Sequence, residues 1–377
     1  MTLVVAMDSF KGALDARAAC AAVARGIAAV RPDAVVIERP MADGGEGTGE
    51  VLHAVVGGRW ATRTVTGPLP DMRVEGRLLM VPAWGPGALV EFASAAGIER
   101  VPSERLDPMR ATSRGVGELI RVAVGLGARV VRLGLGGSAT VDGGVGMARA
   151  LGWRFLDAAG DEVAEGGGGL SGIRRLEAPV DDPLRGVSVE VLCDVENPLV
   201  GPEGAAAVFG PQKGATKEQV RVLDAGLGRL AQTVERDLGF EVAAIPRGGA
   251  AGGAGAGAVA FLGASLLSGV EAVMEATRLD EAIRGATHVL TGEGRLDAQS
   301  LHGKVVSGVA ARARRHRVPV TVLAGRVAVD ALRYRRAGID AAIAISPNDL
   351  DDASARTQTA RRLEESATEW AAGFATP

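Results

Sequence analysis

The chain of 377 residues carries 42 lysine and arginine residues and 45 aspartate and glutamate residues, which gives a formal net charge of −3. This balance excludes the strongly basic surface that binds nucleic acid, and an aromatic content of 3% leaves few side chains on which bases could stack. With 47% hydrophobic and 23% charged residues, the chain can bury a large core, and its length predicts two domains.

The first strands and helices alternate. Residues 3–7 form an apolar run that is typical of a strand buried on both faces. Asp15 is placed to cap a helix that continues to Val30, because the apolar residues that follow it recur with helical spacing. Residues 35–37 predict a second strand, and residues 50–56 predict a second helix.

The middle of the chain has a different pattern. Residues 63–66 and 74–78 alternate polar and apolar side chains around a Gly-Pro-Leu-Pro-Asp turn, which predicts a hairpin. Helical spacing returns at residues 115–124 and 219–238, with many glycine-rich turns between them. This mixture predicts an inserted domain with both helices and strands.

The C-terminal part returns to alternating strands and helices. Strands are predicted at residues 288–290, 320–323 and 341–345, and helices at residues 305–313, 329–336 and 355–370. Strands that alternate with helices form a parallel sheet covered on both faces. We therefore predict an α/β fold in which a Rossmann-like, doubly wound parallel-sheet domain (residues 1–64 plus 285–377) is interrupted by an inserted mixed α/β domain (residues 65–284).

Two features bear on the compartment. Residues 248–270 carry no charge over a length that could span a membrane, but eight of them are glycine, so we expect a glycine-rich loop that leads into a buried helix. Cys20 and Cys193 are far apart in sequence and form no CxxC pair, which is typical of a reducing compartment. We predict a cytoplasmic protein that binds neither membrane nor nucleic acid.

Three segments combine an acid with glycines directly after a predicted strand. They are residues 8–12, 43–48 and 292–297. A single acid at a strand end is often only a helix cap or a loop-former, but the carboxyl ends of parallel strands converge on one edge of a sheet. Converging carboxylates together with a lysine suit the Mg²⁺-assisted transfer of an anionic group.

Two glycine-rich loops lie in the middle of the chain. Residues 133–140 follow a predicted strand and precede a helix, and residues 247–253 form the second loop. Free backbone N–H groups at the start of a helix can cradle an anion. Asp194, between these loops, ends a further apolar strand. The sequence lacks a Walker A loop, a G-x-G-x-x-G fingerprint and a G-x-S-x-G nucleophile elbow.

Lysine is scarce in this chain and is mostly found beside glycine. The four lysines are Lys11, Lys213, Lys217 and Lys304, and all but Lys217 have a glycine neighbour. Lys217 stands in a Thr-Lys-Glu-Gln segment that is typical of the first turn of a helix. A lysine beside flexible backbone offers a point charge to a phosphate, so we interpret the other three as candidate functional residues.

Taken together, these segments resemble the class I glycerate kinase family. The matching segments are residues 8–12, 40–48, 134–140, 142–144, 193–195, 197–199, 209–215, 292–295 with Asp297, 299–300 and 303–304. They follow the family's order and cover nearly the whole chain. Ala13, Val141 and Arg247 depart from it, since the family often has Ser, Asn and Gly at these positions.

The resemblance implies ATP-dependent, Mg²⁺-requiring phosphorylation of D-glycerate in the cytoplasm, with 2-phosphoglycerate favoured as the product. It also implies a site in the cleft between the two domains. We expect a monomer or a small homo-oligomer.

The residues are assigned as follows. We expect Asp8, Lys11, Asp194 and Lys304 to be catalytic, with Asp194 as the base and Lys304 neutralising the transferred group. The acceptor is assigned to Ser9, Lys11, Arg295 and Ser300, because arginine can hold a carboxylate bidentately. The metal is assigned to Asp43 and Asp297, and the nucleotide to Gly136, Gly137, Ser138, Thr140, Lys213, Gly252 and Gly253.

Other functions stay open at this point. The kinase could produce 3-phosphoglycerate or could act on another small hydroxy acid. A metabolite-binding regulator without catalysis is disfavoured, because the chain retains the motif lysines together with Asp8, Asp43, Asp194 and Asp297. A nicotinamide-dependent oxidoreductase is disfavoured by the missing dinucleotide fingerprint.

Overall fold

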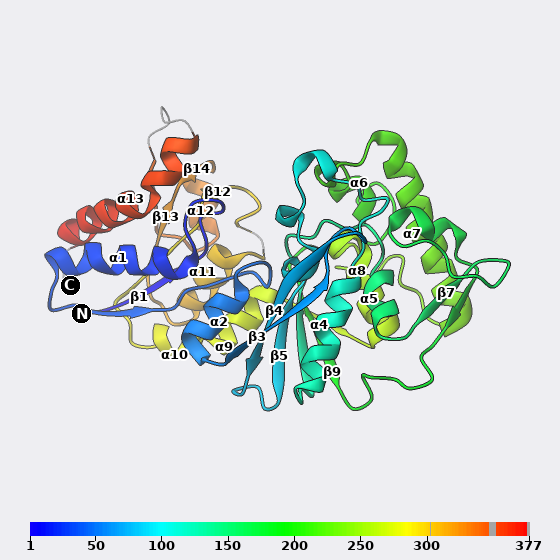
Figure 1. Cartoon of the computed structure of the whole chain (residues 1–377). Helices are drawn as coiled ribbons and strands as arrows, with labels where there is room; N and C mark the ends of the chain where they lie inside the picture. The colour runs from blue at the N-terminus through cyan, green and yellow to red at the C-terminus, as the bar shows by residue number, and fades with distance from the viewer. Residues whose placement is uncertain (302, 347–351, 375–377) are drawn as a thin grey trace. The chain divides into compact units, whose positions relative to one another are not determined.

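The computed structural model describes residues 1–301, 303–346 and 352–374 (Figure 1). The chain divides into two compact units. Unit 1 comprises Met1–Asp43, Glu50–Val56 and the chain from Val270 onward, and unit 2 comprises Gly44–Gly49 and Gly57–Gly269.

The chain passes between the units at other residues than the expected 64/65 and 284/285. The strand β3 (Arg59–Thr66) belongs entirely to unit 2, because it pairs along its whole length with β4 (Arg73–Val81). The helices α9 (Gly269–Ala276) and α10 (Leu279–Ile283) pack their apolar side chains in the core of unit 1, where they join Val289. These boundaries are set by long-range strand pairing and core contacts, which the local sequence pattern does not reveal.

Unit 1 is built on a sheet that has five parallel strands among the described residues. Its order is β15-β13-β11-β1-β2, formed by β1 (Thr2–Met7), β2 (Val35–Glu38), β11 (His288–Gly292), β13 (Val320–Ala324) and β15 (Ala341–Ala344). Numbered along the chain, this order is 2-1-3-4-5, which differs from the Rossmann order 3-2-1-4-5-6. The winding reverses between β1 and β11, where Met7 lies beside Gly292. Ligands of doubly wound sheets bind at such a reversal.

Two of the described helices of unit 1, α1 (Ala16–Val30) and α12 (Ala331–Arg336), begin at an aspartate cap. The other helices of this unit are α2 (Thr48–Val56), α9, α10, α11 (Val305–Arg315) and α13 (Asp352–Gly373), and a short ladder joins β12 (Arg295–Leu296) to β14 (Arg326–Val327). Asp15 caps α1 by accepting a hydrogen bond from the Ala18 N–H at 2.8 Å. The helices α1 and α13 lie side by side (Figure 1), and a Cβ at Gly26 would meet the Glu364 carbonyl oxygen at 2.2 Å.

Unit 2 contains, within the described ranges, a mixed sheet of six strands. Its order is β10-β9-β6-β5-β4-β3, with β5 (Gly87–Glu91), β6 (Val130–Gly134), β9 (Ser188–Leu192) and β10 (Ser265–Leu267) parallel to one another. The strands β3 and β4 form the predicted antiparallel hairpin, in which Thr66 pairs with Arg73. The four parallel strands bring their carboxyl ends to one edge of the sheet.

The helices of unit 2 include one with an interrupted start. The elements are α3 (Ala93–Ala96), α4 (Arg114–Gly125), α5 (Val145–Ala150), α6 (Ala205–Phe209), α7 (Lys217–Leu238), α8 (Ala250–Leu262), four short 3₁₀ turns (98–100, 103–105, 167–172 and 211–213), and the β7 (Arg154–Leu156) and β8 (Arg175–Glu177) pair. Thr216 and Gln219 cap α7 reciprocally, as the segment around Lys217 predicts. In α8 the first turn has left-handed φ values at residues 251–253, and the turns after it are almost wholly buried.

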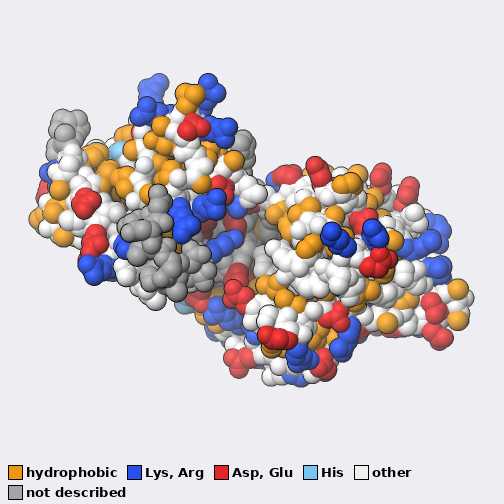
Figure 2. All heavy atoms as spheres, turned by 90° about the horizontal axis from the view of Figure 1, so that it is seen from above, with side chains coloured by type: hydrophobic (Ala, Val, Ile, Leu, Met, Phe, Trp, Pro, Cys, Tyr) orange, Lys and Arg blue, Asp and Glu red, His pale blue; other side chains and the backbone are white. Residues whose placement is uncertain are grey.

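The expected loop leading into a buried helix is thus confirmed at residues 248–262. No helix in the described part of the chain is both long and apolar enough to cross a membrane. On the face drawn in Figure 2, basic and acidic side chains are interspersed.

Candidate active site

The reversal of the unit 1 sheet brings together the loops that follow β1 and β11. The Asp8 N–H donates to the Gly292 carbonyl at 2.9 Å, and the Gly325 N–H donates to the Glu293 carbonyl at 3.1 Å. Glycine is needed at position 292, because a Cβ there would meet the Leu323 carbonyl oxygen at 2.0 Å. The ends of β1, β11 and β13 are therefore packed closely, and the acids that follow β1 and β11, Asp8 and Glu293, interact electrostatically.

Asp8 is the most perturbed acid of this edge. Burial raises the pKa of its carboxyl to about 7, and the negative charges of Asp43 and Glu293 add to the effect. The Ser9 N–H, which donates to Asp8 Oδ1 at 2.6 Å, and the charge of Lys11 oppose the shift. The structure thus brings Asp8, Asp43 and Lys11 into one electrostatic cluster, as the shared position at strand ends predicts.

Glu293 belongs to the same cluster, although it is absent from the predicted site residues. Burial raises the pKa of its carboxyl, while a hydrogen bond from Ser300 and the charges of Lys304 and Lys11 lower it. Its Oε1 atom is buried and accepts no hydrogen bond from the described residues. Its place two residues before Arg295 in a glycine-flanked segment was a signal that could have identified it.

Asp297 and Ser300 organise the loop that carries Arg295. Asp297 Oδ1 accepts hydrogen bonds from the Gln299 and Ser300 N–H groups at 2.9 and 3.3 Å. The buried Ser300 hydroxyl donates to the Arg295 carbonyl at 3.1 Å and accepts from the Asp297 N–H at 3.0 Å. The Arg295 guanidinium is exposed and lies 3.8 Å from Asp297. Asp297 and Ser300 therefore have loop-forming roles beside any contact with a ligand.

The remaining predicted residues of unit 1 lie at its loops and at a helix start. Lys11 is exposed in the turn after β1, and Ser9 is half-buried beside Asp8. Lys304 directly precedes α11, and its backbone N–H donates a hydrogen bond to Ser307 Oγ at 3.1 Å. Its ammonium and the N-terminus of α11 both favour an anion nearby.

The donor set of unit 1 suits a hard cation only in part. Carboxylate oxygens are the ligands that Mg²⁺ prefers, and the buried, unpartnered Oε1 of Glu293 lies in the cluster of Asp8 and Asp43. Nevertheless, the described residues contain no group of three His, Cys, Asp or Glu side chains that could hold a metal ion. Asp43 and Asp297 do not form a protein cage, so an ion here would need oxygens from a ligand.

In unit 2, the carboxyl edge of the parallel strands is filled by two glycine-rich loops packed on each other. The loop after β6 contacts residues 44–46, since a Cβ at Gly134 would meet the Gly44 carbonyl oxygen at 2.5 Å and one at Gly136 would meet Gly45 Cα at 2.6 Å. Gly137 has a φ of +70°, which favours glycine. These glycines are required by close packing, whether or not they also contact a phosphate.

The second loop packs against the first. Gly252 and Gly253 have φ values of +68° and +92°, and a Cβ at Gly252 would meet the Thr140 carbonyl oxygen at only 2.0 Å. The Gly143 N–H donates to the Gly252 carbonyl at 3.0 Å. Arg247, where the family usually has glycine, adopts a φ of +69° and pairs with Glu196 at 2.9 Å. Its extra charge is thus neutralised by a carboxylate of the neighbouring loop.

Lys213 is buried beneath the first loop. Its Nζ atom donates to Ser138 Oγ and to the Thr140 carbonyl, both at 2.7 Å. Burial lowers the pKa of this ammonium to about 7, while the nearby carboxylate of Asp142 opposes the shift. Asp142 itself is fully buried and accepts hydrogen bonds from the Ser113 N–H and hydroxyl at 2.8 and 2.7 Å. Lys213 therefore stabilises the conformation of residues 138–140 through these two hydrogen bonds.

Acidic side chains follow two further strands at the same edge. Asp194, after β9, accepts a hydrogen bond from the Ser268 hydroxyl at 2.7 Å, and Ser268 follows β10. Glu91 ends β5 and accepts a hydrogen bond from the Gly49 N–H at 3.0 Å. Burial raises the pKa of the Glu91 carboxyl. Glu91 is a further residue that the sequence analysis missed, although it is an acid directly after the apolar run of residues 88–90.

A hollow of about 320 Å³ lies beside these groups in unit 2. It is lined by Gly137 from the first loop, Glu46 and Gly47 from residues 44–49, and Arg77, Glu91, Ala93, Ser94, Gly97, Glu99 and Arg100. The hollow is polar and adjoins the predicted nucleotide loop, so it can hold a charged or strongly hydrogen-bonding ligand.

The fold and these two edges define an α/β enzyme of the group-transfer class, with acids and lysines at one strand edge and glycine loops at the other. Comparison of the sequence with protein families identifies the family, because the glycerate kinase family model matches residues 3–375. The chain belongs to the glycerate kinase family and is a phosphotransferase.

Individual relatives cover nearly the whole chain. The chain is 43% identical to glycerate 2-kinase of Escherichia coli (strain K12) over 94% of its own length and 93% of that protein. It is 41% identical to glycerate kinase of Bacillus subtilis (strain 168), over 99% and 98% of the two chains. A crystal structure described as a glycerate kinase 2 from Salmonella typhimurium LT2 superposes with a TM-score of 0.85 at 41% identity, and covers 99% of this chain and 97% of that one.

Proposed function

We propose that this protein transfers the terminal phosphoryl group of ATP to D-glycerate and that the product is 2-phosphoglycerate. The family match over residues 3–375 carries this proposal, and the Escherichia coli relative named glycerate 2-kinase supports the position of the phosphoryl group. We further propose a cytoplasmic location, in keeping with Cys20 and Cys193, which are buried and not joined in a disulfide.

The acceptor is assigned to unit 1. Its carboxylate would be bound by Lys11 and by the exposed guanidinium of Arg295, which can donate two parallel hydrogen bonds. Ser9, beside Asp8, would hydrogen-bond a glycerate hydroxyl. Ser300 keeps its proposed place near the acceptor, but its hydroxyl already serves the loop, so its contribution is to hold Arg295 in position.

Asp8 is the stronger candidate for the general base. A base works best when its pKa lies near the operating pH, and the pKa of Asp8 is raised to about 7. Asp8 would accept the proton of the attacking hydroxyl as the phosphorus–oxygen bond forms. Asp194, the base expected from the sequence, accepts a hydrogen bond from Ser268 and remains the second candidate.

The nucleotide is assigned to unit 2. The N–H groups of residues 136–140 and 252–253 would receive phosphate oxygens, and Lys213 would support this loop from beneath rather than contact the phosphate. Lys304, at the start of α11 in unit 1, would neutralise the transferred group.

Mg²⁺ is proposed to arrive with ATP, held by phosphate oxygens and water with Asp43 or Glu293 as a protein ligand. Such a site needs only one or two carboxylates. The ion would neutralise charge that develops on the phosphate oxygens. Asp297 is the less suitable ligand, because its carboxylate is occupied by loop hydrogen bonds.

The proposed function is tested by product analysis. The protein is incubated with ATP and Mg²⁺ in four parallel reactions that contain D-glycerate, L-glycerate, glycolate or no acceptor. We expect ADP release only with D-glycerate, and we expect NMR to show phosphorus bonded to the oxygen on carbon 2. Phosphorus on carbon 3 would refute the regiochemistry, and equal ADP release with glycolate or without acceptor would refute the substrate.

A further inference from the structure

An arginine-lined hollow of about 380 Å³ lies in unit 2 between α4 and the end of α5. Its lining consists of Arg114, Glu118, Arg121 and Val122 from α4, and Arg149 and Ala150 from α5. The α4 residues stand at positions i, i+4, i+7 and i+8, which places them on one face of the helix. None of the lining residues belongs to a segment that carries the family resemblance.

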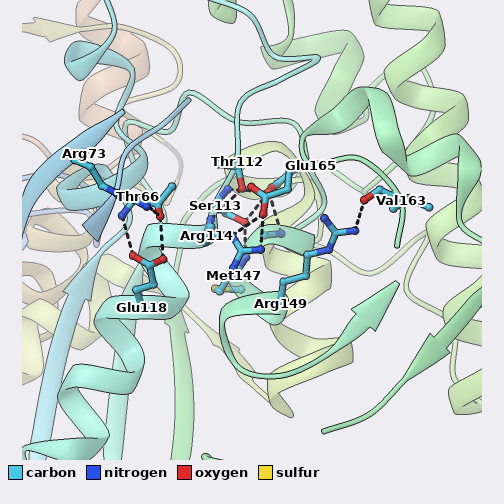
Figure 3. Close-up of polar contacts among 12 residues, drawn as sticks. Thr66, Arg73, Thr112, Ser113, Arg114, Glu118, Met147, Arg149, Val163 and Glu165 are labelled. Carbon is cyan, nitrogen blue, oxygen red and sulfur yellow. Dashed lines mark hydrogen bonds and ion pairs between the residues drawn. The ribbon is translucent and has the colours of Figure 1, made fainter. Parts of the chain in front are cut away.

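Arg149 is a buried cation that forms no ion pair with the described carboxylates, although the negative charges of Glu162, Glu165 and Asp142 act on it. The residue is only 9% exposed, and one guanidinium nitrogen donates to the Val163 carbonyl at 2.6 Å. Its Nε atom is buried and has no hydrogen-bond partner among the described residues. Figure 3 shows the side chain extending toward Val163. Burial lowers the pKa of this guanidinium despite these carboxylates, so an anion bound directly to it would stabilise its charge.

The other lining charges leave an excess of positive charge. Arg114 pairs with Glu165 (Figure 3), while the largely exposed Arg121 donates to the Ala150 carbonyl at 3.2 Å and forms no ion pair with the described residues. The carboxylate of Glu118 accepts hydrogen bonds from the Thr66 N–H and hydroxyl at 2.7 and 2.9 Å. Glu118 is thus satisfied by neutral donors and does not neutralise Arg121 or Arg149.

We propose that this hollow is a second anion-binding site, for a small molecule that bears a phosphate group. Planar guanidinium groups from two helices can donate paired hydrogen bonds to phosphate oxygens, and phosphate offers more acceptor positions than a carboxylate. The volume is sufficient for a phosphate or a three-carbon phosphate ester. The site is independent of the proposed kinase reaction, because its residues take no part in that reaction.

Isothermal titration calorimetry of the full chain tests the site. Inorganic phosphate and glycerol 3-phosphate are titrated into the wild type, Arg121→Glu, Arg149→Lys and Lys11→Ala. Arg121 is exposed, so its replacement tests binding even if the buried Arg149→Lys variant loses stability. Lys11→Ala serves as the control for phosphate binding at the proposed acceptor site. Arg129→Glu, an exposed arginine of unit 2 outside the hollow, controls for net charge.

We expect saturable binding that weakens at least tenfold in Arg121→Glu and changes less than twofold in Lys11→Ala and Arg129→Glu. Tenfold tighter binding of glycerol 3-phosphate than of inorganic phosphate would identify the ligand as a phosphate ester, and equal affinity would identify it as free phosphate. The proposal is overturned if neither probe binds saturably, or if Lys11→Ala abolishes binding while Arg121→Glu leaves it unchanged.

Discussion

Glycine has different structural roles at the two sheet edges, in unit 1 and unit 2, that carry the candidate site residues. In unit 1, glycine at position 292 lets three loops approach, and the acids beside it interact strongly enough to raise the pKa of Asp8. In unit 2, the glycines of residues 134–137 and 252–253 pack loop against loop, and the nearby cation, Lys213, is buried beneath them. The first edge concentrates charged groups, whereas the second is a closely packed backbone surface.

The largest expected effect is on the chemical step at the unit 1 edge. Asp8→Asn removes the proposed base with little change of shape and should lower kcat by about 10²–10⁴-fold. Asp194→Asn should leave kcat within about threefold of the wild type. Steady-state kinetics with saturating ATP and D-glycerate measures both. The reverse order of effects would move the base to unit 2.

Packing at the unit 2 edge is tested by an alanine at Gly252, matched by Gly263→Ala. Both positions have similar left-handed φ values, +68° and +63°, but a Cβ at Gly263 has no neighbour within 4 Å. Backbone strain should lower the free energy of unfolding of each variant by about 1–2 kcal/mol. Overpacking against Thr140 should lower that of Gly252→Ala by about 1–3 kcal/mol more. Denaturant unfolding of the two variants gives the difference. Equal losses of stability in the two variants would show that the loop at Gly252 is not tightly packed against the loop at Thr140.

Binding of the acceptor carboxylate is tested at Arg295. Replacement by lysine keeps the charge but removes the planar guanidinium. We expect a loss of about 1–3 kcal/mol in transition-state binding, which lowers kcat/KM for D-glycerate roughly 5- to 150-fold. Arg315→Lys, an exposed arginine in the last turn of α11, should change nothing. An Arg295→Lys enzyme with wild-type kcat/KM would remove this residue from the site.

The two edges should also give stability opposite dependences on pH. The pKa of Asp8 rises from 3.8 to about 7, so between these values the folded chain holds a proton that the unfolded chain has lost, and the free energy of unfolding falls as pH rises. The pKa of Lys213 falls from 10.5 to about 7, so above pH 7 the unfolded chain holds the extra proton and the free energy of unfolding rises with pH. Each slope is at most about 1.4 kcal/mol per pH unit.

Urea unfolding at pH 5–6.5 and pH 8–9.5 separates these contributions. Asp8→Asn should reduce the slope only in the acidic window, where Glu91 and Glu293, whose pKa values are also raised, keep part of it, and Lys213→Met should reduce the slope only in the alkaline window. The exposed Lys217→Met is the control for loss of a lysine. A slope in the alkaline window that survives in Lys213→Met would show that another group titrates there.

The sequence predicted the helices, the strands and the acids at the strand ends better than it predicted the structural roles of the site residues. Alternating apolar runs located the strands of the parallel sheet, and Asp15 and Thr216 cap the helices that follow them. The domain boundaries differ, because the pairing of β3 with β4 and the core contacts of α9 and α10 are long-range. The strand order 2-1-3-4-5 likewise depends on pairing that no local pattern records.

Within the site, position along the chain identified Asp8, Asp43 and Lys11 as neighbours, since strand ends converge. It could not reveal that Lys213 is buried under the loop that it was expected to assist, because burial depends on the packing of distant segments. Glu293 and Glu91 each had a sequence signal, an acid shortly after an apolar run, but only the folded chain shows that their carboxylates are desolvated.

The division of labour between the two edges is tested most directly by comparing KM values. Lys11→Ala removes a charge from the unit 1 edge, and Gly137→Ala adds a methyl group at the unit 2 edge, where it would lie 3.2 Å from Ala93 Cβ. Lys11→Ala should raise KM for D-glycerate by about tenfold and leave KM for ATP within about twofold, and Gly137→Ala should do the reverse. If both variants raised the two KM values together, or if the pattern were exchanged, the assignment of acceptor and nucleotide to separate edges would be contradicted.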